Sequence, residues 1–254
     1  MEPSQQSSIT VPIAIVFGFS LIALAVYFSG IGSTTEIKPP VQNTEVVKNG
    51  KIKPVDSTDY IRGNPNAPIL VVEYSDYDCA FCKNFHETMN QIMNEFGVTG
   101  RVAWVYRQFP IKELHPNSPR ISEAALCVGE LAGNDGFWKF SDSVFKERGD
   151  TELTNISRLP EYALAAGVDK DAYTKCVENG EQQKTVEANL NEGKELGIAG
   201  TPQSYVIVGN QQATIEGAQP YPIVKQIISD LIGQLEGIDK APAISTTTPN
   251  TTNQ

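Results

Sequence analysis

Two cysteines separated by two residues form the strongest chemical motif of the sequence. Cys79-Ala80-Phe81-Cys82 follows a short apolar run and opens a segment whose apolar residues have helical spacing. The first N–H groups of a helix lack backbone partners and the helix dipole is positive there, so both effects favour a thiolate. Thiols placed in this way have pKa values of about 3.5–7.5, against about 8.5 when free. The motif therefore predicts a redox pair in which Cys79 is the nucleophile and Cys82 releases the mixed disulfide.

Other interpretations of the pair remain open. The C-x-x-C spacing is half of a four-cysteine zinc site, but the remaining cysteines, Cys127 and Cys176, are single and far apart. A purely structural disulfide at this spacing would close an unusually tight ring. We expect a redox pair and no metal site, and a redox-inert or zinc-holding binding module remains the alternative from another functional class.

The segments around the pair predict an α/β fold. Apolar, β-branched runs predict strands, and apolar residues at helical spacing predict helices. The expected strands are residues 69–74, 102–109, 204–208 and 213–216. The expected helices are residues 79–96, 122–127, 137–145, 161–166, 171–178, 181–196 and 222–235. A strand–helix–strand unit, a block of helices, and a hairpin followed by a helix together predict a mixed central sheet.

Four segments resemble the DsbA-type branch of the thioredoxin superfamily, which includes secreted bacterial oxidoreductases. They read EYSDYDCAFCKNFH, FPIKELHPNSPRISEAALCVGELAGNDGFWKFSDSVF, GTPQSYVIVG and IEGAQPY. The resemblance covers nearly all of Asp59–Leu235. It implies a thioredoxin-like domain at residues 59–237, with a mixed central sheet and a helical insertion at about residues 118–197.

The resemblance also implies roles for residues outside the motif. Pro202 matches the cis-proline that faces the redox pair in this superfamily. Thr201, just before it, would offer its backbone to an extended substrate segment. Glu73 matches a buried acid beneath the pair. A carboxyl group buried there would have a raised pKa and would exchange a proton with Cys82.

The dipeptide between the cysteines departs from the pattern of the most oxidising family members. Those members carry a histidine there, whereas Ala80 and Phe81 neither donate a side-chain hydrogen bond nor carry charge. Both are expected to border the bound substrate. Asp76 and Asp78 add negative charge nearby and would oppose the thiolate. We therefore expect a less extreme oxidant, and disulfide reductase or isomerase activity remains an alternative.

The two histidines of the chain are not assigned to catalysis. His86 lies one turn after Cys82 on a mostly apolar helix and is expected to be partly exposed. His115 begins the segment HPNS, which indicates a loop or a helix cap.

Cys127 and Cys176 both fall on expected helices of the inserted block. Many DsbA-like proteins have a second cysteine pair, so the resemblance implies a structural disulfide between them. Closing a loop of about 50 residues would stabilise the fold by about 4 kcal/mol in the chain-entropy model. Two independent buried thiols are the alternative. A structural disulfide requires an oxidising compartment, which places the domain outside the cytoplasmic membrane.

The two ends of the chain differ from the domain in composition. The run from Val11 to Gly32 carries no charge, which predicts a transmembrane anchor in residues 1–32, with a cleaved signal peptide as the alternative. Residues 33–58 are polar and contain prolines, as in a flexible tether. The Thr-rich residues 238–254 predict a disordered tail.

The charge balance restricts the partners. The chain has 20 Lys and Arg against 30 Asp and Glu, a net charge of −10, which is unfavourable for binding nucleic acid. We expect a single-pass protein of the cell membrane with its catalytic domain on the extracytoplasmic side. The resemblance implies that it forms disulfides in exported, unfolded proteins and is reoxidised by a quinone-linked membrane thiol oxidase. No cofactor is expected beyond the two cysteines.

Overall fold

One mixed sheet of five strands organises the protein in a computed structural model that describes residues 51–239. Its strands are β1 (Tyr60–Gly63), β2 (Ile69–Ser75), β3 (Val102–Gln108), β4 (Gln203–Val208) and β5 (Gln211–Glu216). They lie in the order β1-β3-β2-β4-β5. β2 and β3 run parallel, and every other neighbouring pair is antiparallel. The prediction of a mixed central sheet is therefore confirmed.

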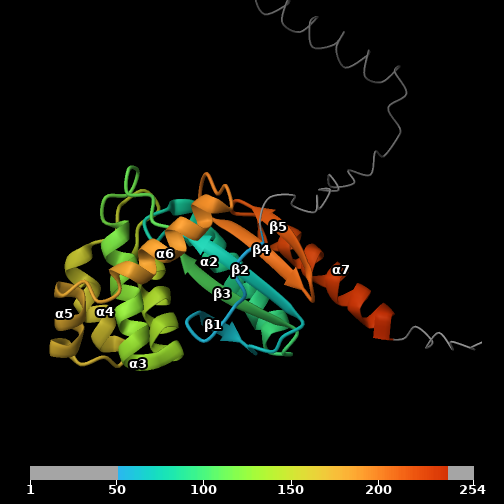
Figure 1. Ribbon diagram of the computed structural model, residues 1–254, viewed down its shortest axis with the longest axis horizontal. Helices are drawn as coiled ribbons and strands as arrows, with labels where there is room; N and C mark the ends of the chain where they lie inside the picture. The colour runs from blue at the N-terminus through green and yellow to red at the C-terminus, as the bar shows by residue number, and fades with distance from the viewer. Residues whose placement is uncertain (1–50, 240–254) are drawn as a thin grey trace, which may run out of the picture. The chain divides into compact units, whose positions relative to one another are not determined.

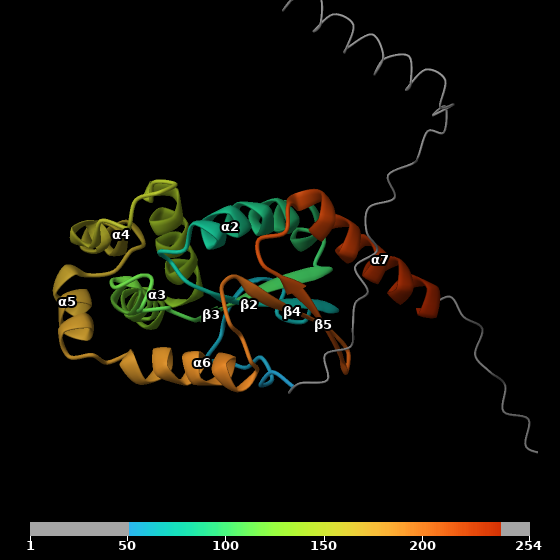
Figure 2. The same cartoon turned by 90° about the horizontal axis from the view of Figure 1, so that it is seen from above.

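Helices cover both faces of this sheet. They are α2 (Ala80–Ile92), α3 (Ser118–Glu147), α4 (Leu159–Ala165), α5 (Lys170–Glu178), α6 (Gln183–Glu195) and α7 (Tyr221–Asp239). A π-helical turn (Met93–Gly97) extends α2, and a 3-10 turn (Ile156–Arg158) precedes α4. Figure 2 shows α2 and α7 on one side of the sheet and α6 on the other.

The central strand β2 is buried on both of its faces, which explains its nearly continuous apolar sequence. Ile69 and Val71 belong to the larger hydrophobic core, on the side of α2 and α7. Val72 and Tyr74 belong to the smaller core, on the side of α6. Side chains alternate along a strand, so Glu73 lies on the same face as Val71 and therefore toward α2.

The helices from α3 to α6 are inserted between β3 and β4. Figure 1 shows α3, α4 and α5 grouped together beside the sheet. The insertion agrees with the expected residues 118–197. Two helices expected at residues 122–127 and 137–145 both lie within α3, which is broken at Gly133, where φ is 71° and ψ is −170°. Glycine adopts this backbone conformation without the steric cost that other residues meet.

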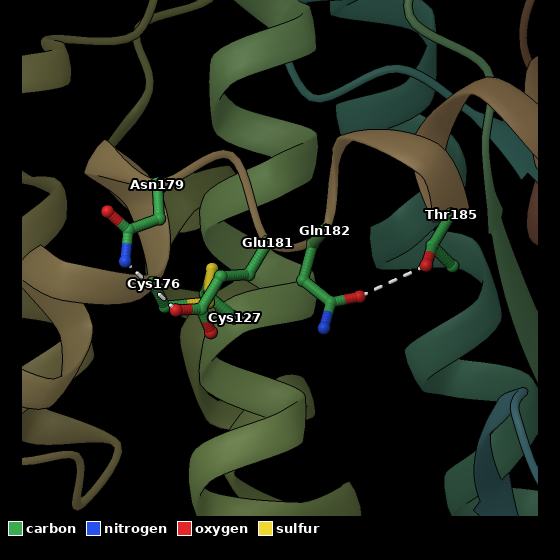
Figure 3. Close-up of a disulfide and its surroundings, with 6 residues drawn as sticks. All are labelled: Cys127, Cys176, Asn179, Glu181, Gln182 and Thr185. Atoms are coloured by element: carbon green, nitrogen blue, oxygen red, sulfur yellow. Dashed lines mark hydrogen bonds between the residues drawn. A yellow bond between two sulfur atoms is a disulfide. The ribbon is translucent and has the colours of Figure 1, made fainter.

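A disulfide joins Cys127 of α3 to Cys176 of α5, with Cα atoms 5.9 Å apart. Both cysteines are buried. Figure 3 shows the bridge close to the turn after α5, where the Asn179 side chain donates a hydrogen bond to the Glu181 carboxylate at 3.2 Å. The bridge therefore links two helices of the insertion that lie 49 residues apart in the sequence.

The segment before β1 packs against the domain, although the sequence assigned it to the flexible tether. Ile52 is 7% exposed and belongs to the smaller core. The Lys53 N–H donates to the Glu192 carboxylate at 2.7 Å, and the Lys53 carbonyl accepts from Arg107 at 3.2 Å. A buried guanidinium needs several acceptors, and this segment supplies some of them. The expected domain boundary at residue 59 is thus corrected, because packed structure already includes Ile52.

The expected membrane anchor, residues 1–32, lies outside the described residues, as does most of the expected tail. Helix α7 extends to Asp239, two residues into the segment expected to be tail. Within residues 51–239, none of the helices combines the length and the apolar character needed to cross a bilayer.

Replacing Cys127 and Cys176 together with serine is expected to lower the free energy of unfolding by about 2–4 kcal/mol, because the bridge restricts the unfolded chain. Guanidinium unfolding followed by tryptophan fluorescence measures the change. A chain with Cys79→Ser and Cys82→Ser keeps the bridge and serves as the control. Equal unfolding midpoints and slopes for the bridge variant and the parent chain would contradict the prediction.

Candidate redox site

Cys79 occupies the N-cap position of α2. Its backbone is extended, with φ −80° and ψ 122°, and its carbonyl accepts a helical hydrogen bond from the Lys83 N–H at 3.2 Å. A side chain in this position faces the first N–H groups of the helix. The Cys79 side chain makes no capping hydrogen bond of regular geometry, but the nearby N–H groups of Phe81 and Cys82 favour its charged form.

These contacts lower the pKa of Cys79 to about 6. The hydrogen bond from the Cys82 side chain is the largest cause, and burial acts in the opposite direction. The backbone N–H groups of Cys82 and Phe81 and the side chain of Thr201 also favour the charged form. Cys79 is therefore a thiolate at neutral pH and a competent nucleophile.

Cys82 has the opposite character. It is completely buried, and this burial raises the pKa of its thiol well above the ordinary value. Interactions with Cys79 and the charge of Glu73 act in the same direction. The backbone N–H of Asp76 donates a hydrogen bond to the Cys82 sulfur at 3.4 Å. The two free cysteines thus form an asymmetric pair of one exchangeable thiolate and one buried thiol.

Glu73 is a completely buried carboxyl group on the α2 side of β2. Trp104 Nε1 donates to one of its oxygens at 2.9 Å, and the other oxygen has no hydrogen-bond partner among the described residues. Burial raises the pKa of Glu73 to about 7, hydrogen bonding opposes this rise, and the charge of Cys79 adds to it. A group with this pKa exchanges protons readily at neutral pH.

The peptide bond between Thr201 and Pro202 is cis and lies just before β4. The Thr201 carbonyl is 3.4 Å from the Cys79 sulfur, although the two residues are 122 positions apart in the sequence. Ala80 is half-buried, whereas the Phe81 side chain is 66% exposed. The structure therefore brings the expected proline segment to the nucleophilic cysteine and leaves an aromatic side chain on the surface beside it.

Asp76 and Asp78 are buried and hydrogen-bonded to neighbouring loops, an arrangement that their expected role did not include. One Asp78 oxygen accepts from the Thr154 N–H at 2.7 Å. One Asp76 oxygen accepts from His115 Nδ1 at 2.9 Å. Hydrogen bonds and burial are the main influences on the pKa of Cys79, and the expected opposition of these carboxylates to the thiolate stays a prediction. His115 lies in a loop, as expected.

His86 is 3% exposed, which corrects the expectation of a partly exposed residue. Its Nε2 pairs with the Asp142 carboxylate at 2.7 Å, and Asp142 also accepts from Arg62 at 2.7 Å. Burial lowers the pKa of His86, and Asp142 opposes this effect. The imidazole packs against Trp104, with ring centroids 5.0 Å apart, and so supports the indole that holds Glu73.

Sequence reasoning missed the role of Trp104. The register of the parallel pair β2–β3 places Val71 opposite Trp104 and Glu73 opposite Tyr106. A buried indole N–H needs an acceptor, and a buried glutamate on the adjacent strand supplies one. Side chains alternate between the two faces along each strand, and this alternation would have predicted that Trp104 and Glu73 lie on the same face.

The zinc alternative requires further ligands around the cysteine pair. Within residues 51–239, no three His, Cys, Asp or Glu side chains are grouped so that they could hold a metal ion. The geometry of the described residues instead matches proton and sulfur chemistry at the pair.

The chain matches the family described as Thioredoxin over residues 56–230. It is also 30% identical over 180 residues to the Na(+)/H(+) antiporter NhaA 1 of Mycolicibacterium gilvum, an alignment that covers 69% of this chain and 26% of that protein. The chain thus spans about a quarter of the length of this relative.

Two solved structures share the fold of this chain. Oxidised BdbD from Bacillus subtilis has a TM-score of 0.63 at 22% identity, over 72% of this chain and 97% of that one. The protein alpha-DsbA1 from Wolbachia pipientis has a TM-score of 0.61 at 19% identity, over 74% and 96% of the two chains. These likenesses confirm the thioredoxin-like fold with its helical insertion.

Replacing Glu73 with glutamine is expected to change how stability depends on pH. The pKa of Glu73 is about 7 in the folded chain and 4.5 ordinarily, so between these pH values the folded state holds a proton that the unfolded state has lost. The parent chain therefore loses stability as pH rises through this window. At one pKa unit per 1.36 kcal/mol, Glu73→Gln is expected to gain about 3 kcal/mol relative to the parent between pH 4 and pH 8.

Urea unfolding of both chains at pH 4 and pH 8, with the Cys79–Cys82 disulfide formed, measures this difference. The disulfide removes the titration of the two thiols from the comparison. Glutamine retains an oxygen that accepts from Trp104, so the hydrogen bond is preserved. Parallel pH profiles for the two chains would show that Glu73 titrates normally.

Proposed function

Because the chain belongs to the thioredoxin family and has a DsbA-type fold, we propose that it is a thiol–disulfide oxidoreductase that forms disulfides in exported proteins. The observation that carries this proposal is the opposite acidity of two neighbouring cysteines. The pKa of Cys79 is lowered to about 6, whereas that of Cys82 is raised well above its ordinary value. A stabilised thiolate favours the reduced form of the pair, and this makes its disulfide an oxidant.

The first half of the reaction begins from the Cys79–Cys82 disulfide. A substrate thiolate attacks the Cys79 sulfur, a bond forms between these two sulfurs, and the bond between Cys79 and Cys82 breaks. Cys82 leaves as a thiolate and takes up a proton, because its buried thiolate is strongly disfavoured. Glu73 is the proposed proton donor, since its pKa of about 7 keeps it partly protonated at neutral pH.

The second half of the reaction releases the product. A second thiolate of the substrate attacks the substrate sulfur of the mixed disulfide, and Cys79 leaves as a thiolate. The substrate loses two electrons and gains a disulfide, while the enzyme pair gains both electrons. The low pKa of Cys79 makes it a good leaving group in this step.

The substrate is proposed to be an extended, unfolded polypeptide. The Thr201 backbone lies beside the Cys79 sulfur and is placed to pair with an extended chain. The exposed Phe81 side chain, with Ala80 before it, offers apolar contact next to the reacting sulfur. A pocket of about 500 Å³ also borders the Thr201–Pro202 segment, with Tyr205 in its wall.

Continued turnover requires an acceptor for the two electrons left on the pair. We propose a quinone-linked thiol oxidase of the membrane as this acceptor. The catalytic domain is proposed to lie on the extracytoplasmic side of the cell membrane, held there by residues 1–32. The Cys127–Cys176 disulfide supports this placement, because such bridges persist in oxidising compartments.

Reductase or isomerase activity is the second candidate function. Phe81 lies between the cysteines and donates no side-chain hydrogen bond to the thiolate, which makes the pair less oxidising than one with a donor there. The reduction potential separates the two functions, with about −120 mV typical of a strong oxidase and about −270 mV of a reductase.

The test uses the purified, oxidised chain and a reduced peptide that contains two cysteines. We expect one equivalent of the chain to convert one equivalent of peptide to its disulfide, as measured by mass spectrometry. Cys79→Ala is expected to abolish the conversion. A reduced Cys82→Ala chain treated with oxidised glutathione is expected to keep one glutathione on Cys79, because no second thiol is there to release it.

Two results would contradict the proposal. The first is peptide oxidation that continues at the parent rate in the Cys79→Ala chain. The second is a pair that equilibrates with glutathione at a potential near that of a reductase, about −270 mV.

A further inference from the structure

Asp76 contacts both cysteines of the pair through its backbone. Its N–H donates to the Cys82 sulfur at 3.4 Å, and its carbonyl accepts from the Cys79 N–H at 3.1 Å. Asp76 follows the last residue of β2 and precedes the start of α2, so it sets the geometry of the turn between them. A rotation of Asp76 would therefore disturb one backbone hydrogen bond to Cys79 and one to Cys82.

The Asp76 side chain is fixed by four hydrogen bonds. Its carboxylate is completely buried and accepts from the Asp78 N–H at 2.9 Å, within the same turn. It also accepts from the Ile111 N–H at 2.7 Å, from His115 Nδ1 at 2.9 Å and from the Ser118 hydroxyl. Four donors are about the full capacity of a carboxylate. A residue held in this way has little freedom to rotate.

Three of these donors come from one connection, the loop from β3 into α3. Ile111 and His115 lie in the loop, and Ser118 is the first residue of α3. The His115 side chain is 18% exposed, so it lies between the buried carboxylate and the surface. Nδ1–H donates to Asp76 in the protonated imidazole and in one neutral tautomer, so the hydrogen bond does not require a charged ring.

We propose that Asp76 and His115 form a positioning pair that fixes the turn before Cys79 and thereby sets the reactivity of both cysteines. This inference rests on the proposed oxidoreductase function. It gives a positioning role to two residues whose side chains contact no reacting atom. The Asp76 backbone makes the contact with Cys82, and the His115 imidazole helps to hold that backbone in place.

The contacts form a continuous series of hydrogen-bond donors. The Asp76 N–H donates to the Cys82 sulfur, and the Cys82 side chain in turn hydrogen-bonds to Cys79. A group that accepts a hydrogen bond becomes a better donor, so the first contact strengthens the second. When the turn loosens, the Cys79 thiolate loses part of its stabilisation and the reduced form of the pair becomes less stable.

The test compares three variants of the full chain with the parent. His115→Ala removes one donor to the carboxylate. Asp76→Asn replaces one acceptor oxygen by an NH₂ group, which accepts no hydrogen bond, so the side chain cannot keep all the contacts of the carboxylate. His115→Asn keeps an amide N–H close to the position of Nδ1 and so restores the contact without an imidazole.

The first readout is the equilibrium of the redox pair with glutathione at pH 7. We expect it to shift toward the protein disulfide by about threefold in His115→Ala and by about tenfold in Asp76→Asn, equivalent to about 14 and 30 mV for a two-electron couple. His115→Asn is expected to stay close to the parent. The second readout is the alkylation rate of Cys79 at pH 6, which is expected to fall in the same order.

Asp59→Asn is the matched control for lost stability. Asp59 is another buried carboxylate, and it accepts from Arg107 at 2.9 and 2.8 Å. Arg107 also pairs with Glu192 of α6, on the side of the sheet away from α2. This control is expected to lower the free energy of unfolding while leaving the glutathione equilibrium and the alkylation rate unchanged.

The outcomes separate this inference from the function on which it rests. If His115→Ala and Asp76→Asn lose stability as Asp59→Asn does but keep the parent equilibrium and alkylation rate, the pair is only structural and the inference is overturned. If His115→Asn behaves as His115→Ala does, the hydrogen bond to Asp76 is not the cause. A parent chain without reversible exchange at Cys79 and Cys82 would instead overturn the proposed function, and this inference with it.

Discussion

The sulfur of Cys79 lies where a helix begins, and the remaining features of the site depend on that position. Backbone N–H groups at the start of α2 face the sulfur, and the Cys82 side chain adds the strongest hydrogen bond to it. Because β2 is the central strand of the sheet, the turn that leads from it into α2 is buried, and hydrogen bonds from neighbouring loops hold it. A thiolate therefore forms on a rigid support, beside the Thr201 carbonyl.

Burial has the opposite effect on the two groups beneath this thiolate and favours their neutral forms. Cys82 and Glu73 are both completely shielded from solvent, so both favour their neutral forms. The charge of Glu73 disfavours a thiolate on Cys82, which fits the proposed transfer of one proton between them when the disulfide opens. The indole of Trp104 limits this effect, because its hydrogen bond favours the ionised form of Glu73. The acidity of Cys79 thus follows from its hydrogen bonds, whereas the basicity of Cys82 and Glu73 beneath it follows from burial.

The sequence predicted most of this arrangement, and its failures have physical causes. The central strands and the pair at residues 79 and 82 were predictable, because burial on both faces and a helix start leave clear patterns. Strand β1 was missed because YIRG is only four residues long and half-buried, and its pairing with β3 depends on tertiary contacts. The burial of His86 was misjudged and the hydrogen bonds of Asp76 were missed, because their partners lie 56 and 39 positions further along the chain. Long-range hydrogen bonds of this kind leave no local signal.

The ionisation of Cys79 is tested most directly by a pH titration of thiolate absorbance in the reduced chain, with Cys82→Ala measured in parallel. The parent is expected to ionise with a midpoint near pH 6. The variant is expected to ionise at a clearly higher pH, because the strongest hydrogen bond to the thiolate is lost. A parent midpoint at about 8.5, the value of a free thiol, would contradict the account, as would identical curves for the two chains.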